Sequence, residues 1–426
     1  MENTERMIRI AVITPMKNAE ATIQRALKSV DDQNQSYDMV HYLIDDGCDD
    51  ATLEKIDEYK KMTSDGRENY AIILRTSVYS GQSGARNTAI NDISLDDFDY
   101  VAFLDADDWW EPHHLECAIG ELVNGNSDFV CGIPELVDTN GNKVSPIGIP
   151  VGQEPNVYNI FKSNSLYIST VVMRTSVIQV VGDFDSRLDC IEDWDYWIRV
   201  LLAGISIKLT LNQTAHYTVD PNSMSGKVTP EKLSLLKSKH RDACNVEIVK
   251  HLMRQPVPIR LNLGCGDERI PGFINCDLYE DKADMQFDAK AIPFPDNSVD
   301  EIRAYHILEH FKFKEAWRVL EEWKRVLKPG GRFVQETPDL LNTCRKFVES
   351  DEQVRVMLYG HFFAWPDISP GQVHYFLYTE TQLKWTLEQA GFERIERMYP
   401  DSTYATANPQ WPELYLKTEA YKPYGQ

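Results

Sequence analysis

The stretch Phe103-Leu104-Asp105-Ala106-Asp107-Asp108-Trp109-Trp110 decides the fold of the first half of this chain. An apolar run ends there in three carboxylates, and Pro112 interrupts the segment soon after. We expect a buried strand whose acids lie at the carboxyl edge of an α/β sheet, where open sheets bind ligands. Carboxylates this close repel one another, so a divalent cation is the natural compensation, and that cation would attract a diphosphate. The pattern favours a metal–nucleotide site.

Length, composition and charge limit the class of protein. The 426 residues predict two or three domains, and 42% apolar with 26% charged residues is typical of a soluble globular protein. The net charge of −22, acidic in both halves, argues against a nucleic-acid partner. We expect no integral membrane segment and no signal peptide, hence a cytoplasmic protein; peripheral attachment to the inner face of a membrane and the oligomeric state stay open. Eight scattered cysteines without a Cys-x-x-Cys pair favour reduced thiols.

Strands and helices alternate in the first half, which predicts a βαβ sheet. The expected elements are a strand at 8–14, a helix at about 19–30, a strand at 41–44, a helix at about 51–62 and a strand at 71–74. The polar segment 226–255 is helix-prone and ends at Pro256 and Pro258, after which a new strand begins. We therefore predict a domain at 1–225, a helical linker at 226–255 and a second α/β domain at 256–426.

Six motifs in the first half occur in the order typical of one enzyme family. They are Thr14-Pro15-Met16-Lys17-Asn18, Asp45-Asp46-Gly47-Cys48-Asp49-Asp50, Gly84-Ala85-Arg86-Asn87, Leu104-Asp105-Ala106-Asp107-Asp108, Glu192-Asp193-Trp194-Asp195 and Pro221-Asn222-Ser223-Met224-Ser225. In these motifs the chain resembles the inverting family 2 glycosyltransferases of the GT-A fold. A lone Asp-Asp-Gly is most often a turn, so the order of the motifs carries the resemblance.

The resemblance implies residues that bind a nucleotide-sugar donor, with a UDP-sugar as the leading candidate. Asp46, with Asp45 beside it, would recognise the base or the ribose. Thr14 and Pro15 would lie next to that nucleoside, and Arg86 would touch a phosphate.

The resemblance also implies a metal and a base. Asp105 and Asp107 would hold Mn²⁺ or Mg²⁺ on the donor diphosphate, with Asp107 as the more direct ligand. Asp193 would act as general base on the hydroxyl of a glycan or glycolipid acceptor, and the anomeric centre would invert.

One part of the family pattern is missing. The family often has an Arg and a His shortly before its final Ser-x-Ser, whereas Thr218 and Asp220 stand here. His216 is either a substitute contact to metal or phosphate or a structural histidine.

The second half has its own set of motifs. They are Arg260-Leu261-Asn262-Leu263-Gly264-Cys265-Gly266, Phe273-Ile274-Asn275-Cys276-Asp277, Ile292-Pro293-Phe294-Pro295-Asp296-Asn297-Ser298-Val299-Asp300, His306-Ile307-Leu308-Glu309-His310 and Val326-Leu327-Lys328-Pro329-Gly330-Gly331-Arg332. Over these motifs the chain resembles class I methyltransferases, which have a Rossmann-like fold and use S-adenosyl-L-methionine. Gly264 and Gly266 would then line the methionine and ribose of that cofactor. Asp277 would accept hydrogen bonds from the ribose hydroxyls unless it is a surface acid, and Asp288 would meet the adenine amino group.

The second half departs from its family in three respects. Asn262 stands where the family has an acid, and Asp267-Glu268 replace a third glycine. Only nine residues, 264–272, separate the first two strands, where a parallel crossover usually needs about a dozen. No base for the methyl acceptor is identified; His306, His310 and His374 are candidates, each of them equally a structural histidine.

Three functions remain open at this stage. The leading one is a bifunctional enzyme that transfers a sugar and also methylates. Because the two domains are fused in one chain, we expect both to act on the same glycan. The second keeps the glycosyltransferase active and makes the carboxy-terminal half a non-catalytic binding or dimerisation module. The third, a nucleic-acid base-modifying enzyme, is disfavoured by the net charge and by the absence of a basic stretch with interleaved aromatic residues.

Overall fold

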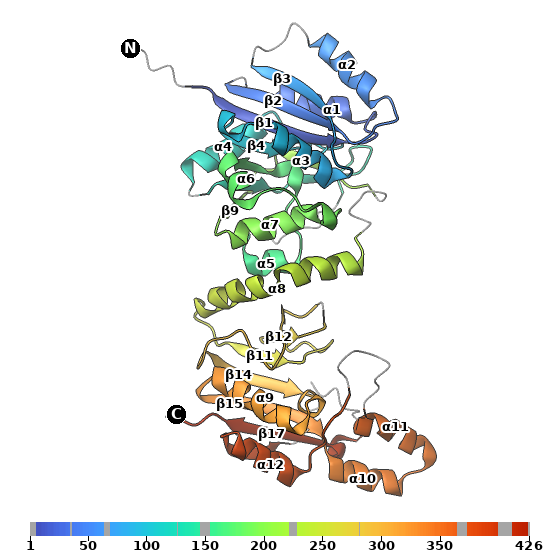
Figure 1. Cartoon of the computed structure of the whole chain (residues 1–426), viewed down its shortest axis with the longest axis vertical. Coiled ribbons are helices and arrows are strands. Elements are labelled where there is room, and N and C mark those ends of the chain that lie inside the picture. The colour runs from blue at the N-terminus through green and yellow to red at the C-terminus, as the bar shows by residue number, and fades with distance from the viewer. Residues whose placement is uncertain are drawn as a thin grey trace. The chain divides into compact units, whose positions relative to one another are not determined.

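The chain folds into two compact units, Met1–Cys244 and Asn245–Gln426 (Figure 1). The computed structural model describes residues 6–34, 36–63, 69–125, 127–144, 154–220, 228–280, 282–363, 373–398 and 411–424. The boundary between the units falls within helix α8 (Pro230–Met253), which occupies most of the segment predicted as a linker.

The first unit is built on a seven-stranded sheet with the strand order β3-β2-β1-β4-β8-β6-β9. Strand β1 pairs in parallel with β2 and β4, and β8 is antiparallel to its neighbours β4 and β6. The strands are β1 (Ile8–Met16), β2 (Tyr37–Asp45), β3 (Tyr70–Thr76), β4 (Tyr100–Phe103), β6 (Phe129–Gly132), β8 (Val172–Arg174) and β9 (Ile207–Thr210). The alternating α/β pattern predicted for this half is therefore confirmed.

A second, three-stranded sheet, the helices α1 to α7, three short 3-10 helices and the first part of α8 make up the rest of the regular structure described in this unit. The small sheet has the order β5-β10-β7, with β5 (Trp109–Trp110), β7 (Glu135–Val137) and β10 (Ala215–Thr218). The helices are α1 (Ile23–Asp31), α2 (Thr52–Met62), α3 (Gln82–Asp92), α4 (His114–Asn124), α5 (Val157–Lys162), α6 (Thr175–Val181) and α7 (Glu192–Leu202).

Helix α1 shows how the sequence builds the core. Ile23, Ala26, Leu27 and Val30 recur at helical spacing, and none is exposed. Ala26 and Val30 pack with strand residues of β1 and β4, while Ile23 and Leu27 pack with buried residues of α2. One helix thereby ties the sheet to the next helix (Figure 1).

The parallel pairing brings the predicted acids to one edge of the sheet. Met16 of β1 lies opposite Asp45 of β2, and Ile13 lies opposite Phe103 of β4. Because parallel strands end on the same side, the acids after β2 and β4 share the carboxyl edge, as the opening motif predicted.

The first half of α8 is anchored to α7 by a buried carboxylate. Asp195 is fully buried and accepts hydrogen bonds from His240 Nε2 at 2.7 Å and Lys239 Nζ at 2.6 Å. Burial raises the pKa of Asp195, but the hydrogen bonds from His240 and Lys239 and the charge of Arg199 outweigh it and lower the pKa to about 2. This pairing fixes the helix that carries Asp193.

The second unit has a seven-stranded sheet with the order β13-β12-β11-β14-β15-β17-β16. Strands β11 to β15 run parallel to one another, and β17 lies antiparallel between β15 and β16. The strands are β11 (Arg260–Leu263), β12 (Ile274–Asp277), β13 (Met285–Gln286), β14 (Val299–Tyr305), β15 (Leu327–Pro338), β16 (Glu393–Met398) and β17 (Tyr415–Tyr421). The helices are α9 (Phe313–Val326), α10 (Leu340–Glu349), α11 (Glu352–Phe363) and α12 (Glu380–Gln389). This is the expected Rossmann-like arrangement with one antiparallel strand added.

The connection from β11 to β12 is unusual for parallel neighbours. Residues 264–273 are all described and contain turns but no helix. The short spacing noted in the sequence thus corresponds to a crossover without its usual helix. Among the helices that the structure describes, none combines the length and apolar character needed to cross a bilayer.

Candidate active site

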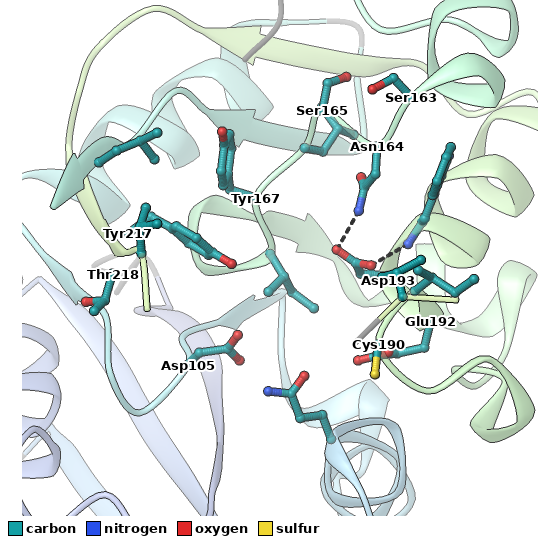
Figure 2. Close-up of a pocket in the computed structure, with 18 of the residues that line it drawn as sticks. Asp105, Ser163, Asn164, Ser165, Tyr167, Cys190, Glu192, Asp193, Tyr217 and Thr218 are labelled. Atoms are coloured by element: carbon teal, nitrogen blue, oxygen red, sulfur yellow. Dashed lines mark hydrogen bonds between the residues drawn. The ribbon is translucent and has the colours of Figure 1, made fainter. Parts of the chain in front are cut away.

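A cavity of about 560 Å³ opens in the first unit, where the acidic turn after β4 faces the start of α7 (Figure 2). Its lining includes four of the predicted site residues, Arg86, Asp105, Asp107 and Asp193. The other contributions come mainly from the segment 162–168, from residues 190–194 and from the end of β10.

The acidic turn is shaped by a serine that the sequence did not single out. The Ser169 hydroxyl donates to the Asp108 carboxylate and accepts from the backbone N–H of Asp105 at 3.0 Å. The other carboxylate oxygen of Asp108 accepts from the Thr218 N–H at 2.7 Å. Burial and the neighbouring Asp107 and Asp105 raise the pKa of Asp108 well above its usual value. Asp108 is therefore an internal anchor, which leaves Asp105 and Asp107 to face the cavity.

The two cavity-facing acids differ in their partners. Asp105 is paired with Arg86 at 2.7 Å. Within the described parts of the chain, no Lys, Arg or His forms an ion pair with the Asp107 carboxylate. Burial, followed by the charge of Asp105, raises the pKa of Asp107 to about 6. This carboxylate has room for a cation.

Arg86 lies between the two acidic groups of the site. One of its terminal nitrogens donates to Asp105 and the other to Glu192, each at 2.7 Å, and the side chain is 1% exposed. Burial lowers the pKa of Arg86, but the carboxylates of Asp105 and Glu192 outweigh it and hold the pKa above its usual range. The guanidinium joins the acidic turn to α7, and a phosphate contact stays a prediction.

Asp193 is the second residue of α7 and projects into the cavity (Figure 2). One carboxylate oxygen accepts from Asn164 Nδ2 at 3.0 Å, and the other accepts from the Trp194 N–H at 2.7 Å. Burial, followed by the adjacent charge of Glu192, raises the pKa of Asp193 to about 7. A carboxyl group with this pKa exchanges protons readily near neutral pH.

The four residues predicted to bind the nucleoside lie at the ends of β1 and β2, outside the lining of this cavity. Thr14 is fully buried and its hydroxyl pairs with His41 Nε2 at 2.8 Å. Pro15 is buried as well. Asp45 accepts from the N–H groups of its own turn, and Asp46 accepts from the Gly81 N–H at 3.1 Å. The Thr14 hydroxyl is therefore bonded inside the core, whereas the carboxylates of Asp45 and Asp46 lie at the edge of the sheet.

His216 occupies a structural position. Its ring stacks on Trp109 at 4.5 Å between centroids, and Nε2 lies 2.7 Å from Glu111. Thr218, where the family often has a basic residue, binds Asp108 through its N–H and the Asp107 carbonyl through its hydroxyl. The motif Pro221–Ser225 lies outside the described residues.

Asn164, Ser169, Glu192 and Tyr217 are the site residues that sequence reasoning missed or left without a role. The first two come from the segment before β8, which has no motif of its own. Glu192 was visible beside Asp193, but its partner Arg86 is 106 positions away. The Tyr217 ring packs on Tyr167 at 5.0 Å and forms part of the cavity wall.

In the second unit, the glycine loop after β11 is hydrogen-bonded to Asp277, the acid predicted at the end of the next strand. The Gly266 N–H donates to one oxygen of Asp277 at 3.0 Å, and the Tyr279 N–H donates to the other at 2.8 Å. A Cβ on Gly264 would lie 2.8 Å from the Ile307 side chain, and φ there is +64°, so only glycine fits without displacing Ile307. Asp288 is bound to the N–H of Lys290 at 2.9 Å.

The histidines proposed as methyl-acceptor bases have different surroundings. The ring nitrogens of His306 lie 3.3 Å from Glu309 and 3.2 Å from Glu336. Burial lowers the pKa of His306, but hydrogen bonds to these two carboxylates outweigh it and raise the pKa to about 9. With both nitrogens facing acceptors, His306 lacks the free lone pair that a base needs. His310 and His374 lie close to Glu309 and to each other.

Comparison with known proteins agrees with both units. Residues 11–176 match the family described as Glycosyl transferase family 2, and residues 271–335 match a Methyltransferase domain. The chain is 32% identical over 195 residues to the UDP-Glc:alpha-D-GlcNAc-diphosphoundecaprenol beta-1,3-glucosyltransferase WfgD of Escherichia coli, covering 45% of this chain and 69% of that protein. It is 33% identical over 123 residues to the succinoglycan biosynthesis protein ExoW of Rhizobium meliloti, covering 29% of this chain but only 36% of that protein.

Among solved structures, that of S. aureus TarS 1–349 in complex with UDP-GlcNAc is similar at a TM-score of 0.46 and 18% identity, covering 58% of this chain and 72% of that one. The fold, the two family matches and the identity to the E. coli enzyme lead to one conclusion. This chain belongs to glycosyltransferase family 2 and is an enzyme that carries a methyltransferase domain in its carboxy-terminal unit.

Proposed function

We propose that the first unit is a metal-dependent, inverting glycosyltransferase that moves a sugar from a nucleotide-sugar donor, a UDP-sugar foremost, to a hydroxyl of a glycan or glycolipid. The observation that carries this proposal is the shared cavity. Asp193, with its pKa raised to about 7, lines the same cavity as Asp105 and Asp107. The E. coli relative, whose name gives UDP-Glc as donor and a diphosphoundecaprenol-linked sugar as acceptor, supports these substrate classes.

In the proposed reaction Asp193 is the general base. Its carboxylate takes the proton of the acceptor hydroxyl, whose oxygen forms the new bond to the anomeric carbon. The bond from that carbon to the diphosphate breaks, and its electron pair leaves with the diphosphate. Attack from the face opposite the leaving group inverts the anomeric centre. Asn164 and the Trp194 N–H hold the carboxylate in position for this transfer.

Asp105 and Asp107 are the residues that would hold the metal. Both are carboxylates on the cavity, and Asp107 has no paired cation among the described residues, so the donor set fits a hard divalent ion. Mn²⁺ or Mg²⁺ bound there would stabilise the negative charge of the leaving diphosphate. Arg86 holds Asp105 in place for this role. Asp45 and Asp46, with Thr14 and Pro15 behind them, are proposed to border the nucleoside.

Replacing Asp107 with Asn is expected to lower metal-dependent sugar transfer by on the order of 10²-fold, since a metal is worth several kcal/mol of charge stabilisation. A thermal-shift panel of nucleotide sugars with Mn²⁺ first identifies the donor, because bound ligand stabilises the fold by mass action. Transfer is then measured with and without Mn²⁺. Asp57→Asn on the exposed face of α2 is the matched control. Full activity of Asp107→Asn would exclude this residue as a metal ligand.

We propose further that the second unit uses S-adenosyl-L-methionine, the methyl donor that a methyltransferase domain implies, to methylate a glycan. Gly264 and Gly266 would border the methionine and ribose, Asp277 would accept from the ribose hydroxyls, and Asp288 would meet the adenine. The closed loop between Gly266 and Asp277 supports this placement, since the carboxylate lies at the carboxyl end of β12.

The variant Asp277→Ala is expected to weaken S-adenosylmethionine binding by about 10- to 100-fold, because hydrogen bonds to a charged group contribute about 1.5–3 kcal/mol. Isothermal titration calorimetry measures the affinity, and Asp296→Ala on the surface near α9 is the control. If the unaltered protein binds no S-adenosylmethionine, the second unit is instead a non-catalytic binding or dimerisation module. Unchanged affinity in Asp277→Ala would remove this residue from the cofactor site.

A further inference from the structure

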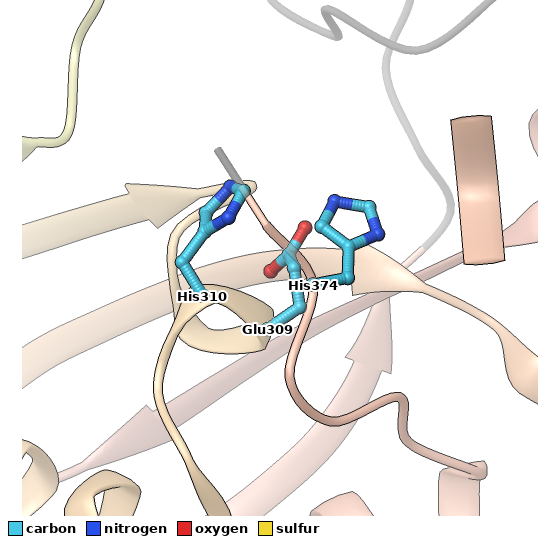
Figure 3. Close-up of side chains that lie close together, drawn as sticks. All are labelled: Glu309, His310 and His374. Atoms are coloured by element: carbon cyan, nitrogen blue, oxygen red, sulfur yellow. The ribbon is translucent and has the colours of Figure 1, made fainter. Parts of the chain in front are cut away.

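Glu309, His310 and His374 form a cluster in the second unit that neither proposed reaction uses (Figure 3). Glu309 and His310 belong to a short 3-10 helix, Leu308–His310, that follows β14, and His374 comes from a distant segment. Each residue offers one ligand atom, and these atoms lie within 4.8 Å of one another. Figure 3 shows the Glu309 carboxylate between the two imidazole rings, whose centroids are 5.0 Å apart.

Backbone carbonyls fix the protonation of both histidines. Nδ1 of His310 lies 3.2 Å from the Val373 carbonyl, and Nδ1 of His374 lies 3.0 Å from the His361 carbonyl. Because a carbonyl only accepts, each Nδ1 carries the proton, and Nε2 of the neutral ring keeps its lone pair. Histidines that bind a metal through one ring nitrogen usually donate the N–H of the other ring nitrogen to a carbonyl or carboxylate, and this hydrogen bond orients the ring.

The third member of the cluster is held equally firmly. Glu309 is fully buried, and one of its carboxylate oxygens accepts from the Thr337 hydroxyl at 3.0 Å. Its backbone carbonyl accepts from the Tyr375 N–H at 2.8 Å, which fixes the segment of His374 against the 3-10 helix. The other carboxylate oxygen of Glu309 lies 3.3 Å from His306 Nδ1, so the carboxylate is held on both oxygens while the ligand atoms of the cluster lie within 4.8 Å of one another.

We propose that Glu309, His310 and His374 bind one divalent transition-metal ion of the zinc class. Two imidazoles and one carboxylate are a ligand set of catalytic zinc sites, which leave a fourth position for water or substrate. Tetrahedral zinc with bonds of about 2.1 Å needs ligand atoms about 3.4 Å apart, so from separations within 4.8 Å the side chains close by at most about 1.4 Å when the ion binds. The rings of His310 and His374 are only partly buried and have the freedom to do so.

The position of the cluster suggests what the fourth ligand would be. Ile307, next to the 3-10 helix, packs on Gly264 of the glycine loop. The ion would therefore lie near the proposed methyl donor, at the carboxyl ends of the strands, where it would hold an oxygen of the methyl acceptor. That placement rests on the proposed methyl transfer, whereas the binding of the ion does not.

Cobalt(II) titration of the full-length protein tests the site. The titration uses the full-length Asp107→Asn variant in excess Mg²⁺, so that Co²⁺ does not bind at the carboxylate site of the first unit. Mg²⁺ prefers oxygen ligands, whereas imidazole suits transition metals. We expect one equivalent of Co²⁺ to bind with a tetrahedral visible spectrum that lacks a thiolate charge-transfer band, and Zn²⁺ to displace it.

The variants His310→Ala and His374→Ala are each expected to lose this equivalent and its spectrum, while His113→Ala, an exposed histidine of the first unit, keeps both. Circular dichroism and S-adenosylmethionine binding check that the variants fold. The proposal is wrong if the Asp107→Asn protein binds no Co²⁺, or if the spectrum survives in His310→Ala. Co²⁺ binding without S-adenosylmethionine binding would retain the metal site and reject the acceptor role.

Discussion

Asp193→Asn is expected to lower the rate constant of sugar transfer by about 10²–10⁴-fold, the usual contribution of a general base. The amide keeps the size of the side chain and the position at the start of α7, but it cannot take a proton from the acceptor hydroxyl. Donor binding should change little, because the predicted metal and nucleoside residues remain. Initial rates over a range of acceptor concentrations, together with donor affinity by calorimetry, separate the two effects.

The pH dependence of the unaltered enzyme provides a second measurement. Because the pKa of Asp193 is about 7 and the base must be ionised, kcat should rise with pH through 7 and level off above it. The hydrogen bond from Asn164 lowers this pKa, so Asn164→Ala should shift the rising limb to higher pH. If Asn164 had only a structural role, Asn164→Ala would lower kcat without shifting the pH at which kcat rises. If Asp193→Asn kept full activity, or if kcat of the unaltered enzyme did not change between pH 5 and 9, another residue would have to be the general base.

Arg86→Met is expected to reduce the free energy of unfolding by about 3–5 kcal/mol, the range measured when one partner of a buried ion pair is removed. The variant leaves Asp105 and Glu192 without their shared cation, and Glu192 is 2% exposed. Urea unfolding followed by circular dichroism measures the change. Adding Glu192→Gln should recover part of the loss, because one fewer buried charge is then left unpaired.

Arg75→Met is the matched control for this prediction. Arg75 pairs with Asp92 at 2.9 Å, but the two side chains are 48% and 37% exposed. Exposed pairs contribute at most about 1 kcal/mol, so the control should lose far less stability than Arg86→Met. Equal losses in the two variants would show that the bridge from the acidic turn to α7 does not stabilise the fold.

Much of the fold could be predicted because its signals are local. The run before Asp105 and the strand that ends at Asp45 are buried, and helix α1 has its apolar residues at helical spacing. Strand ends followed by acids or glycines place those residues at the carboxyl edge of any parallel sheet. The short spacing after Gly264 likewise indicated a shortened crossover, and the structure shows that this crossover has no helix.

The partners of the site residues could not be predicted in this way. Asn164 reaches Asp193 across 29 positions and Ser169 reaches Asp108 across 61, from a segment without a motif. Arg86 resembles a phosphate ligand by its motif, yet its guanidinium is occupied by two carboxylates of the chain. Such pairings depend on how distant segments pack, which spacing in the sequence does not encode.

The sequence by itself therefore determined the two α/β units, the order of their motifs and the edge of each sheet at which chemistry is expected, because strand periodicity and strand ends are properties of short segments. Only the tertiary structure decided which carboxylates are bonded to other parts of the chain, as Asp108 is to Ser169 and Thr218, and which have no ion-pair partner among the described residues, as Asp107. It alone brought His374 to Glu309 and His310, since burial, ion pairing and ligand geometry arise between residues that meet only in the folded chain.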